Sequence, residues 1–152
     1  MAKRLAKERA DLDANPDKED RFCVESVNND LEWTMVLLID EAADCCYAGG
    51  IYTLKLIFPS AYPSKPPMIR FNPSPFHTHI RQENGDIEAE FLEEWGPTCN
   101  VKWIMGGLYQ MFLTEGSDSA RVLESDIMRL KQENYEAFVK KVKDQIAELN
   151  EE

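Results

Sequence analysis

The stretch from residue 47 to residue 67 decides the fold, and it reads Y-A-G-G-I-Y-T-L-K-L-I-F-P-S-A-Y-P-S-K-P-P. Tyr47 to Gly50 is a turn signal, and Ile51 to Phe58 predicts a β-strand that stops at Pro59. A dense proline block follows, at positions 63, 66 and 67. Because proline lacks an N–H and has a fixed φ, this block cannot be a central strand. We therefore expect a rigid, extended connection to the next apolar run, Met68 to Phe71.

Two earlier runs also have strand character. Phe22 to Val27 and Leu31 to Ile39 are rich in apolar and β-branched residues, and Asn28 to Asp30 is a turn signal between them. Together with the two strands that flank the proline block, they predict a four-stranded antiparallel meander.

Helical spacing appears on both sides of this sheet region. Ala2 to about Asp13 predicts a helix that ends at Asn15-Pro16, since the residue before proline avoids the helical region. Asn100 is a plausible N-cap for a central helix, which should be buried on its apolar face, and Gly106-Gly107 would permit close packing on the sheet. The apolar positions are Ala2, Leu5, Ala6 and Leu12 in the first helix, and Val101, Ile104, Met105, Leu108, Met111 and Phe112 in the central one.

Two more helices are predicted at the C-terminal end, after a loop at Gly116 to Ser119. The first is short, from Val122 to about Leu130, and the last begins at Asn134. One apolar stripe in the last helix is most simply a packing face. Its members are Tyr135, Phe138, Val139, Val142, Ile146 and Leu149.

Composition bounds the class of protein. The 152 residues predict one domain, residues 1–152, and the net charge of −11 argues against nucleic acid as a partner. No run approaches the ~20 apolar residues that would cross a membrane. The charged N-terminus lacks the apolar core of a secretory signal, so we expect a cytoplasmic or nuclear protein with free thiols and no cofactor. The four cysteines are Cys23, Cys45, Cys46 and Cys99.

The order of these motifs resembles the ubiquitin-conjugating enzyme family. Its members show Y-x-G-G-x-F-x-L-x-I-x-F-P, Y-P-x-x-P-P, a histidine-proline-asparagine motif, N-G-x-I-C and W-S-P. This chain has the first two nearly intact from Tyr47 to Pro67, followed by His77-Thr78-His79, Asn84-Gly85 and Trp95-Gly96-Pro97. The resemblance implies an α+β fold: an N-terminal helix, the four-stranded meander, a central helix and two C-terminal helices.

The nucleophile that defines the family is missing. The cysteine of N-G-x-I-C corresponds to Glu88, or to Ile87 if His77 and Trp95 are aligned without a gap, and no cysteine occurs between Cys46 and Cys99. The asparagine that helps to stabilise the oxyanion is replaced by His79. Since the chemistry needs a thiolate that can both attack and leave, the resemblance implies a variant that has the fold without the catalytic thiol.

Three other interpretations stay open. A divergent active enzyme would use Cys99, which precedes the central helix, as its thioester nucleophile. A second possibility is an adaptor unrelated to ubiquitin, since the segment from Phe76 to Ile87 is also similar to adaptors of the fused-toes type. His77 and His79 would share one face of a strand and could be half of a metal site, but a metal needs three or four ligands, so we expect none.

The resemblance also implies partners and contact residues. The basic face of the first helix, Lys3, Arg4 and Lys7, corresponds to the contact with the activating enzyme. Ser64 or Lys65 and Pro97 or Thr98 correspond to the contact with a ligase. Expected partners are ubiquitin, a ubiquitin-like protein or an active conjugating enzyme. An acidic cluster around the former active site is either a solvated loop or an attraction for a basic partner; it comprises Glu83, Asp86, Glu88, Glu90, Glu93 and Glu94.

Overall fold

The computed structural model describes residues 2–14, 21–28, 31–115 and 122–150, with only the backbone of Ala2 and Glu90. Within this part of the chain the predicted antiparallel meander is confirmed, in the order β1-β2-β3-β4. Alternate residues of the inner strands, such as Met35 and Leu54, are paired and fully buried, so one face of the sheet forms the floor of the core. The strands are β1 (Phe22–Asn28), β2 (Glu32–Leu38), β3 (Ile51–Ile57) and β4 (Met68–Phe71).

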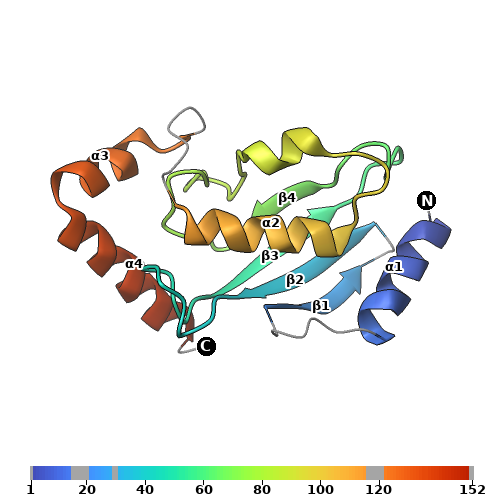
Figure 1. Cartoon of the computed structure of the whole chain (residues 1–152), viewed down its shortest axis with the longest axis horizontal. Coiled ribbons are helices and arrows are strands. Elements are labelled where there is room, and N and C mark those ends of the chain that lie inside the picture. Colours follow the sequence, from blue (N-terminus) through green and yellow to red (C-terminus); the bar gives the residue numbers. More distant parts are fainter. Residues whose placement is uncertain (1, 15–20, 29–30, 116–121, 151–152) are drawn as a thin grey trace.

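Helices cover that face and both ends of the sheet. Figure 1 shows α2 lying across the sheet, α1 at one end, and α3 and α4 at the other. The elements are α1 (Ala2–Ala14), the 3₁₀ helix η1 (Glu90–Glu94), α2 (Val101–Leu113), α3 (Ser125–Glu133) and α4 (Tyr135–Asn150). None of the described helices is both long and apolar enough to span a bilayer. The order and positions of the helices and strands confirm the expected α+β arrangement.

Helix α2 is the centre of the core, as predicted. The side chain of Asn100 accepts a hydrogen bond from the amide of Trp103 at 2.8 Å, which caps the first turn. Ile104, Leu108 and Phe112 are fully buried against the sheet side of the core. The cap therefore fixes the first turn of α2, and the buried side chains fix its apolar face.

The connection between β3 and β4 is not extended, so this part of the prediction is wrong. It folds into successive turns, in which the amide of Tyr62 donates to the carbonyl of Pro59 at 3.0 Å and the amide of Ser64 donates to Ala61 at 2.8 Å. The prolines prevent strand pairing, but they are compatible with turns, where a fixed φ is an advantage. The indole Nε1 of Trp95 donates to the carbonyl of Pro63 at 2.8 Å and holds this connection against the tryptophan turn.

Helix α3 begins three residues later than predicted from Val122. The amides of Leu123 and Glu124 both donate to the carbonyl of Thr78, at 2.9 and 3.1 Å. Their backbone is therefore used to bind a distant loop, and the helix starts only at Ser125. The loop predicted at Gly116 to Ser119, most of the turn at 28–30 and the helix stop at Asn15-Pro16 lie outside the described residues.

Three packing expectations are also wrong. Gly107 lies against η1 and not against the sheet, since a Cβ there would be 2.5 Å from the ring of Phe91, and Gly106 has open space beside it. Tyr135 is 55% exposed and lies off the buried stripe of α4. Ala6 is exposed on α1, where the buried positions belong to Leu5 and Glu8. The helix η1 was not predicted from the sequence, because it is too short to show a helical period.

Candidate functional site

The segment that corresponds to the family's active site forms a short two-stranded reversal between residues 79 and 88. Ile80 and Ile87 make an isolated antiparallel bridge, and the amide of Glu88 donates to the carbonyl of His79 at 3.0 Å. The structure therefore brings His77, His79 and Glu88 together, as their place in the family motifs implied. The outward side chain at the end of this reversal is that of Glu88, which is exposed, whereas Ile87 packs against the core.

A glycine turn sets the direction of this reversal. Gly85 has a φ of +81°, and a Cβ at this position would lie 1.9 Å from the carbonyl oxygen of Phe71. The amide of Phe71 donates to the carbonyl of Gly85 at 3.0 Å, so the turn is hydrogen-bonded directly to the end of β4. Asn84 accepts from the amide of Asp86 at 3.0 Å, as expected for an Asx turn. Only glycine fits here, and its conformation places residues 86–88 beside the sheet.

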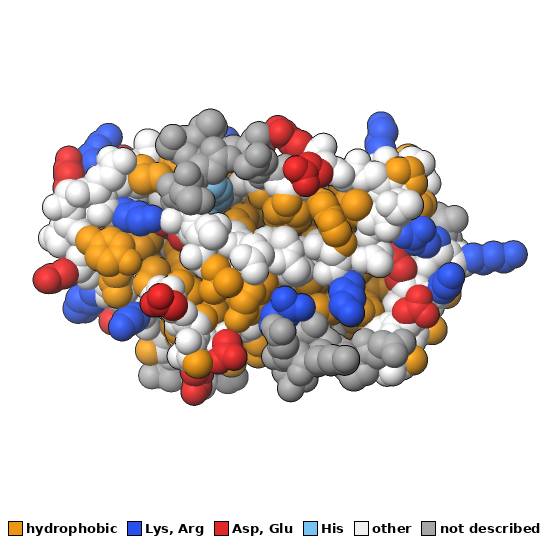
Figure 2. Space-filling view, in the orientation of Figure 1, with side chains coloured by type: hydrophobic (Ala, Val, Ile, Leu, Met, Phe, Trp, Pro, Cys, Tyr) orange, Lys and Arg blue, Asp and Glu red, His pale blue; other side chains and the backbone are white. Residues whose placement is uncertain are grey.

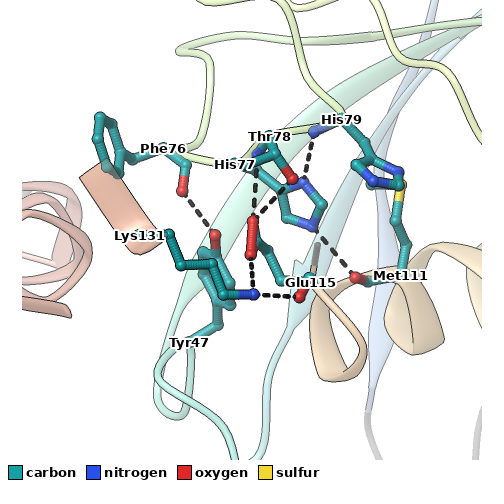
Figure 3. Close-up of polar contacts among 8 residues, drawn as sticks. All are labelled: Tyr47, Phe76, His77, Thr78, His79, Met111, Glu115 and Lys131. Atoms are coloured by element: carbon teal, nitrogen blue, oxygen red, sulfur yellow. Dashed lines mark hydrogen bonds and ion pairs between the residues drawn. The ribbon is translucent and has the colours of Figure 1, made fainter. Parts of the chain in front are cut away.

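His77 is fully buried, and both of its ring nitrogens have partners (Figure 3). Nδ1 accepts from the amide of His79 at 3.0 Å, so the proton lies on Nε2, which donates to the carbonyl of Met111 at 3.1 Å. Burial lowers the pKa of His77 to about 4, against an ordinary value of 6.5, although the nearby Glu115 opposes this shift. The imidazole is thus neutral at pH 7 and serves to join the loop to the C-terminal part of α2.

Thr78 lies at the centre of a buried polar network. Glu115 accepts hydrogen bonds from the Thr78 hydroxyl at 2.8 Å and from Lys131 Nζ of α3 at 2.8 Å, and Lys131 also donates to the Glu115 carbonyl (Figure 3). Burial alone would raise the pKa of Glu115, but His77, Lys131 and Thr78 outweigh it and hold the pKa below its usual range. This network joins the loop, the end of α2 and α3 into one unit.

The residues just before His77 are held equally firmly. Tyr47 of the Y-x-G-G turn donates from its hydroxyl to the carbonyl of Phe76 at 2.6 Å. Gln145 of α4 accepts from the amide of Phe76 and donates to the carbonyl of Ser74, both at 2.8 Å. Segment 74–80 is therefore hydrogen-bonded to α2, α4, the residues just before α3 and the turn before β3.

The acidic cluster surrounds this segment on its solvent side. Glu83, Glu88, Glu93 and Glu94 are exposed. Asp86 forms an ion pair with Arg70 of β4 at 2.8 Å. Figure 2 shows acidic side chains at the upper edge of the face that carries α2. The side chain of Glu90, which the sequence placed in the same cluster, lies outside the described part.

Cys99 lies at the opposite end of α2 from His77. Its carbonyl accepts from Arg4 Nη2 at 2.9 Å, immediately before the first residue of the helix. His77 contacts Met111 near the last residue, and the ten-residue advance from Val101 to Met111 spans about 15 Å at ~1.5 Å per residue. Cys99 and His77 therefore lie at different ends of α2 and do not form one site.

The remaining thiols also lack the features of a nucleophile. Cys23 is exposed on β1, and burial together with Glu25 raises its pKa. Burial, with the neighbouring Cys45 as a smaller cause, raises the pKa of Cys46 to about 11. Since the thiolate is the reactive form, these cysteines are poorly suited to carry an acyl group at pH 7.

The predicted contact residues on α1 do not all face solvent. Lys3 and Lys7 are exposed, but Arg4 points inward, donating to Glu8 at 3.1 Å as well as to Cys99. Ser64, Lys65, Pro97 and Thr98 are all exposed, on two connections that Trp95 joins through its hydrogen bond to Pro63.

A metal at His77 and His79 is not favoured by the geometry, since both nitrogens of His77 are already engaged in hydrogen bonds. Among the described residues, no group of three or more His, Cys, Asp and Glu could hold a metal ion. The sequence motifs assign no role to Glu8, which only matches the family's R-L-x-K-E helix, and they do not include Glu115 or Lys131. Helical spacing could have identified Glu8, because it lies three residues after Leu5 on the same face.

The chain also matches the model of one known protein family. A family model described as ubiquitin-conjugating enzyme matches residues 4–146, which is nearly the whole chain. The match begins within α1 and ends within α4, so it includes the sheet, the former active-site segment and α2.

Proposed function

This chain belongs to the ubiquitin-conjugating enzyme family, which supports a role in the ubiquitin pathway, and we propose that it acts there without forming a thioester. In this proposal it is a non-catalytic variant that binds ubiquitin, a ubiquitin-like protein or an active conjugating enzyme. The family implies interaction with ubiquitin and with activating enzymes and ligases. We further propose a cytoplasmic or nuclear location.

The observation that carries this proposal is the exposed side chain of Glu88. It occupies the outward position at the end of the 79–88 reversal, where the family motif has cysteine. A carboxylate cannot replace a thiol in this role, because thioester transfer needs a group that attacks as a thiolate and leaves as one. The negative charge of Glu88 can instead attract a basic surface of a partner protein.

The side chains of His77 and Thr78 give independent support. His77 donates to Met111 and accepts from the amide of His79, and Thr78 is bound to Glu115. An oxyanion hole needs donors directed at an empty position where charge develops. The polar atoms of His77 and Thr78 are instead directed at other atoms of the protein.

The alternative in which Cys99 carries the thioester receives no support from this geometry. The backbone carbonyl of Cys99 is bound to Arg4 of α1, and α2 rises about 15 Å from Val101 to Met111, whose carbonyl binds His77. An adaptor unrelated to ubiquitin remains the second candidate, since an exposed acidic surface would bind any basic partner.

A thioester assay tests the non-catalytic part of the proposal. The protein is incubated with activating enzyme, ATP and ubiquitin, and we expect no adduct that a reductant removes. A matched reaction with an active conjugating enzyme shows that the activating enzyme works. An adduct that disappears in Cys99→Ser would refute the proposal and establish Cys99 as the nucleophile.

A pull-down tests the binding part. Immobilised protein should retain ubiquitin, a ubiquitin-like protein or an active conjugating enzyme in purified form. Each of these is offered separately, so that a positive result names the partner class. Retention of none of the three would favour the unrelated adaptor.

A further inference from the structure

Glu8 is an unusual residue for an N-terminal surface helix, because its carboxylate is buried. Only 7% of the residue is exposed, whereas its neighbour Lys7 on α1 faces solvent. A buried carboxylate is costly unless several donors surround it. Three donors from three different parts of the chain do so here.

One donor comes from the start of α2. The amide of Val101 donates to Glu8 Oε1 at 2.8 Å. This amide is one of the unpaired groups at a helix N-terminus, which favours a negative charge. Two residues therefore cap the N-terminus of α2: Asn100, which directly precedes the helix, and Glu8, which belongs to α1.

The second donor comes from the proline connection. The hydroxyl of Tyr62 donates to Glu8 Oε2, and this atom also accepts from Arg4 at 3.1 Å. Arg4 then reaches the carbonyl of Cys99 at 2.9 Å. We call Arg4, Glu8 and Tyr62 the α1 latch, since together they bind α1 to the 59–67 connection and to the 96–100 turn.

The rest of α1 is held less closely. A groove of about 530 Å³ lies between its C-terminal half and the sheet, over Trp33 and Val27. The charged pair on that half, Arg9 and Asp13, lies at the surface and joins α1 only to itself. The latch is thus the principal polar attachment described between α1 and the two connections.

We propose that Glu8 is a positioning residue that joins α1, the 59–67 connection and the 96–100 turn into one partner-binding surface. Both connections carry exposed residues, Ser64 and Lys65 on the first and Pro97 and Thr98 on the second. Glu8 contacts no partner itself, but it fixes the distance between the two sets. The binding role of this surface rests on the proposed function, whereas its rigidity does not.

Hydrogen exchange measures the rigidity without any partner. In Glu8→Gln, the amides of Ser64, Cys99 and Val101 should exchange at least about tenfold faster, because a hydrogen bond to a charged group contributes on the order of 1.5 kcal/mol or more. The matched control is Arg9→Gln, which removes the surface pair one residue away and should leave these rates unchanged. Equal rates in wild type and Glu8→Gln would overturn the proposal.

A second variant covers the case in which Glu8→Gln loosens the whole protein, including α4. Tyr62→Phe removes one hydroxyl from the latch and keeps the ring contact with Trp95. It should accelerate exchange in α1 and the two connections while α4 keeps its protection. If Tyr62→Phe leaves α1 and both connections as protected as in wild type, the latch does not position them.

Binding is then measured with the same variants, using purified ubiquitin and an active conjugating enzyme as probes. Weaker retention by Glu8→Gln than by Arg9→Gln supports the positioning role. If wild type and Glu8→Gln bind a probe equally well, the positioning role fails and the proposed function stands. If wild type binds neither probe while exchange accelerates as expected, the proposed function fails and the latch stands as a purely structural device.

Discussion

Lowering the pH should destabilise this protein through His77 before its carboxylates become protonated. The folded state holds the imidazole neutral down to a pKa of about 4, because the ring is buried, whereas the unfolded chain takes up the proton near 6.5. The unfolded state therefore binds more protons in this range, and stability must fall as the pH falls. The contribution is fully present above pH 6.5 and is lost between 6.5 and 4.

The size of the effect follows from the two pKa values. At about 1.4 kcal/mol per pH unit, the whole interval between 6.5 and about 4 corresponds to about 3 kcal/mol. Between pH 7 and pH 5 the same linkage gives a loss of about 2 kcal/mol. Glu115, whose pKa is held below its usual range, adds to the loss only at lower pH, so between pH 7 and pH 5 the difference between wild type and a variant without this imidazole isolates His77.

Urea unfolding followed by circular dichroism at pH 7 and pH 5 measures this loss. His77→Gln cannot take up a proton, so its loss between the two pH values should be smaller by about 2 kcal/mol than that of wild type. Thr78→Val is the control, because it removes a hydrogen bond to Glu115 but keeps the imidazole, and it should retain the wild-type loss. The reasoning is refuted if His77→Gln loses as much stability as wild type, or if the imidazole of His77 titrates above pH 6 by NMR.

Three further outcomes are expected. Gly85→Ala should destabilise the fold by about 2 kcal/mol or more, since a left-handed φ and contact with Phe71 oppose a Cβ. Gly106→Ala, where a Cβ has open space, should stabilise the fold by about 1 kcal/mol. Equal effects of the two substitutions in thermal unfolding would contradict this reasoning. Glu88→Cys should not restore full conjugating activity, because His79 still replaces the family's asparagine; a wild-type family rate in a ubiquitin transfer assay would show otherwise. Charge reversal of the acidic cluster by Glu90→Lys, Glu93→Lys and Glu94→Lys should weaken partner binding most at low salt, because the Debye length is about 30 Å at 0.01 M. An unchanged affinity at both low and high salt would mean that the cluster is only a solvated loop.

The sheet and the central helix could be predicted because their signals are local. Alternating burial in β2 and β3, the Asn100 cap and the Asn84-Gly85 turn each depend on residues a few positions apart. The start of α3 could not be predicted in this way. It depends on the backbone of Glu124, whose φ of −115° and ψ of 88° are not helical, and the amides of Leu123 and Glu124 bind the carbonyl of Thr78, more than forty residues earlier.

The candidate site was predictable in its position but not in its chemistry. The motifs placed His77, His79 and Glu88 in one region, and the structure brings them together. The partners of that region were not predictable, because Glu115 and Lys131 have no periodic relation to it. The inward direction of Arg4 was not predictable either, since a charged residue on a surface helix is usually exposed, and here the buried Glu8 and the distant Cys99 carbonyl both accept from it.

In the segment that carries His77 and Thr78, the buried polar side-chain atoms of these two residues are paired within the protein. A catalytic segment must keep donors free for the reaction, and such free donors cost stability when they are buried. Here the ring of His77 and the hydroxyl of Thr78 are satisfied by Met111 and Glu115. These polar atoms are thus used for stability, and the charges that the segment presents to solvent, such as Glu88, can act in recognition without a catalytic role.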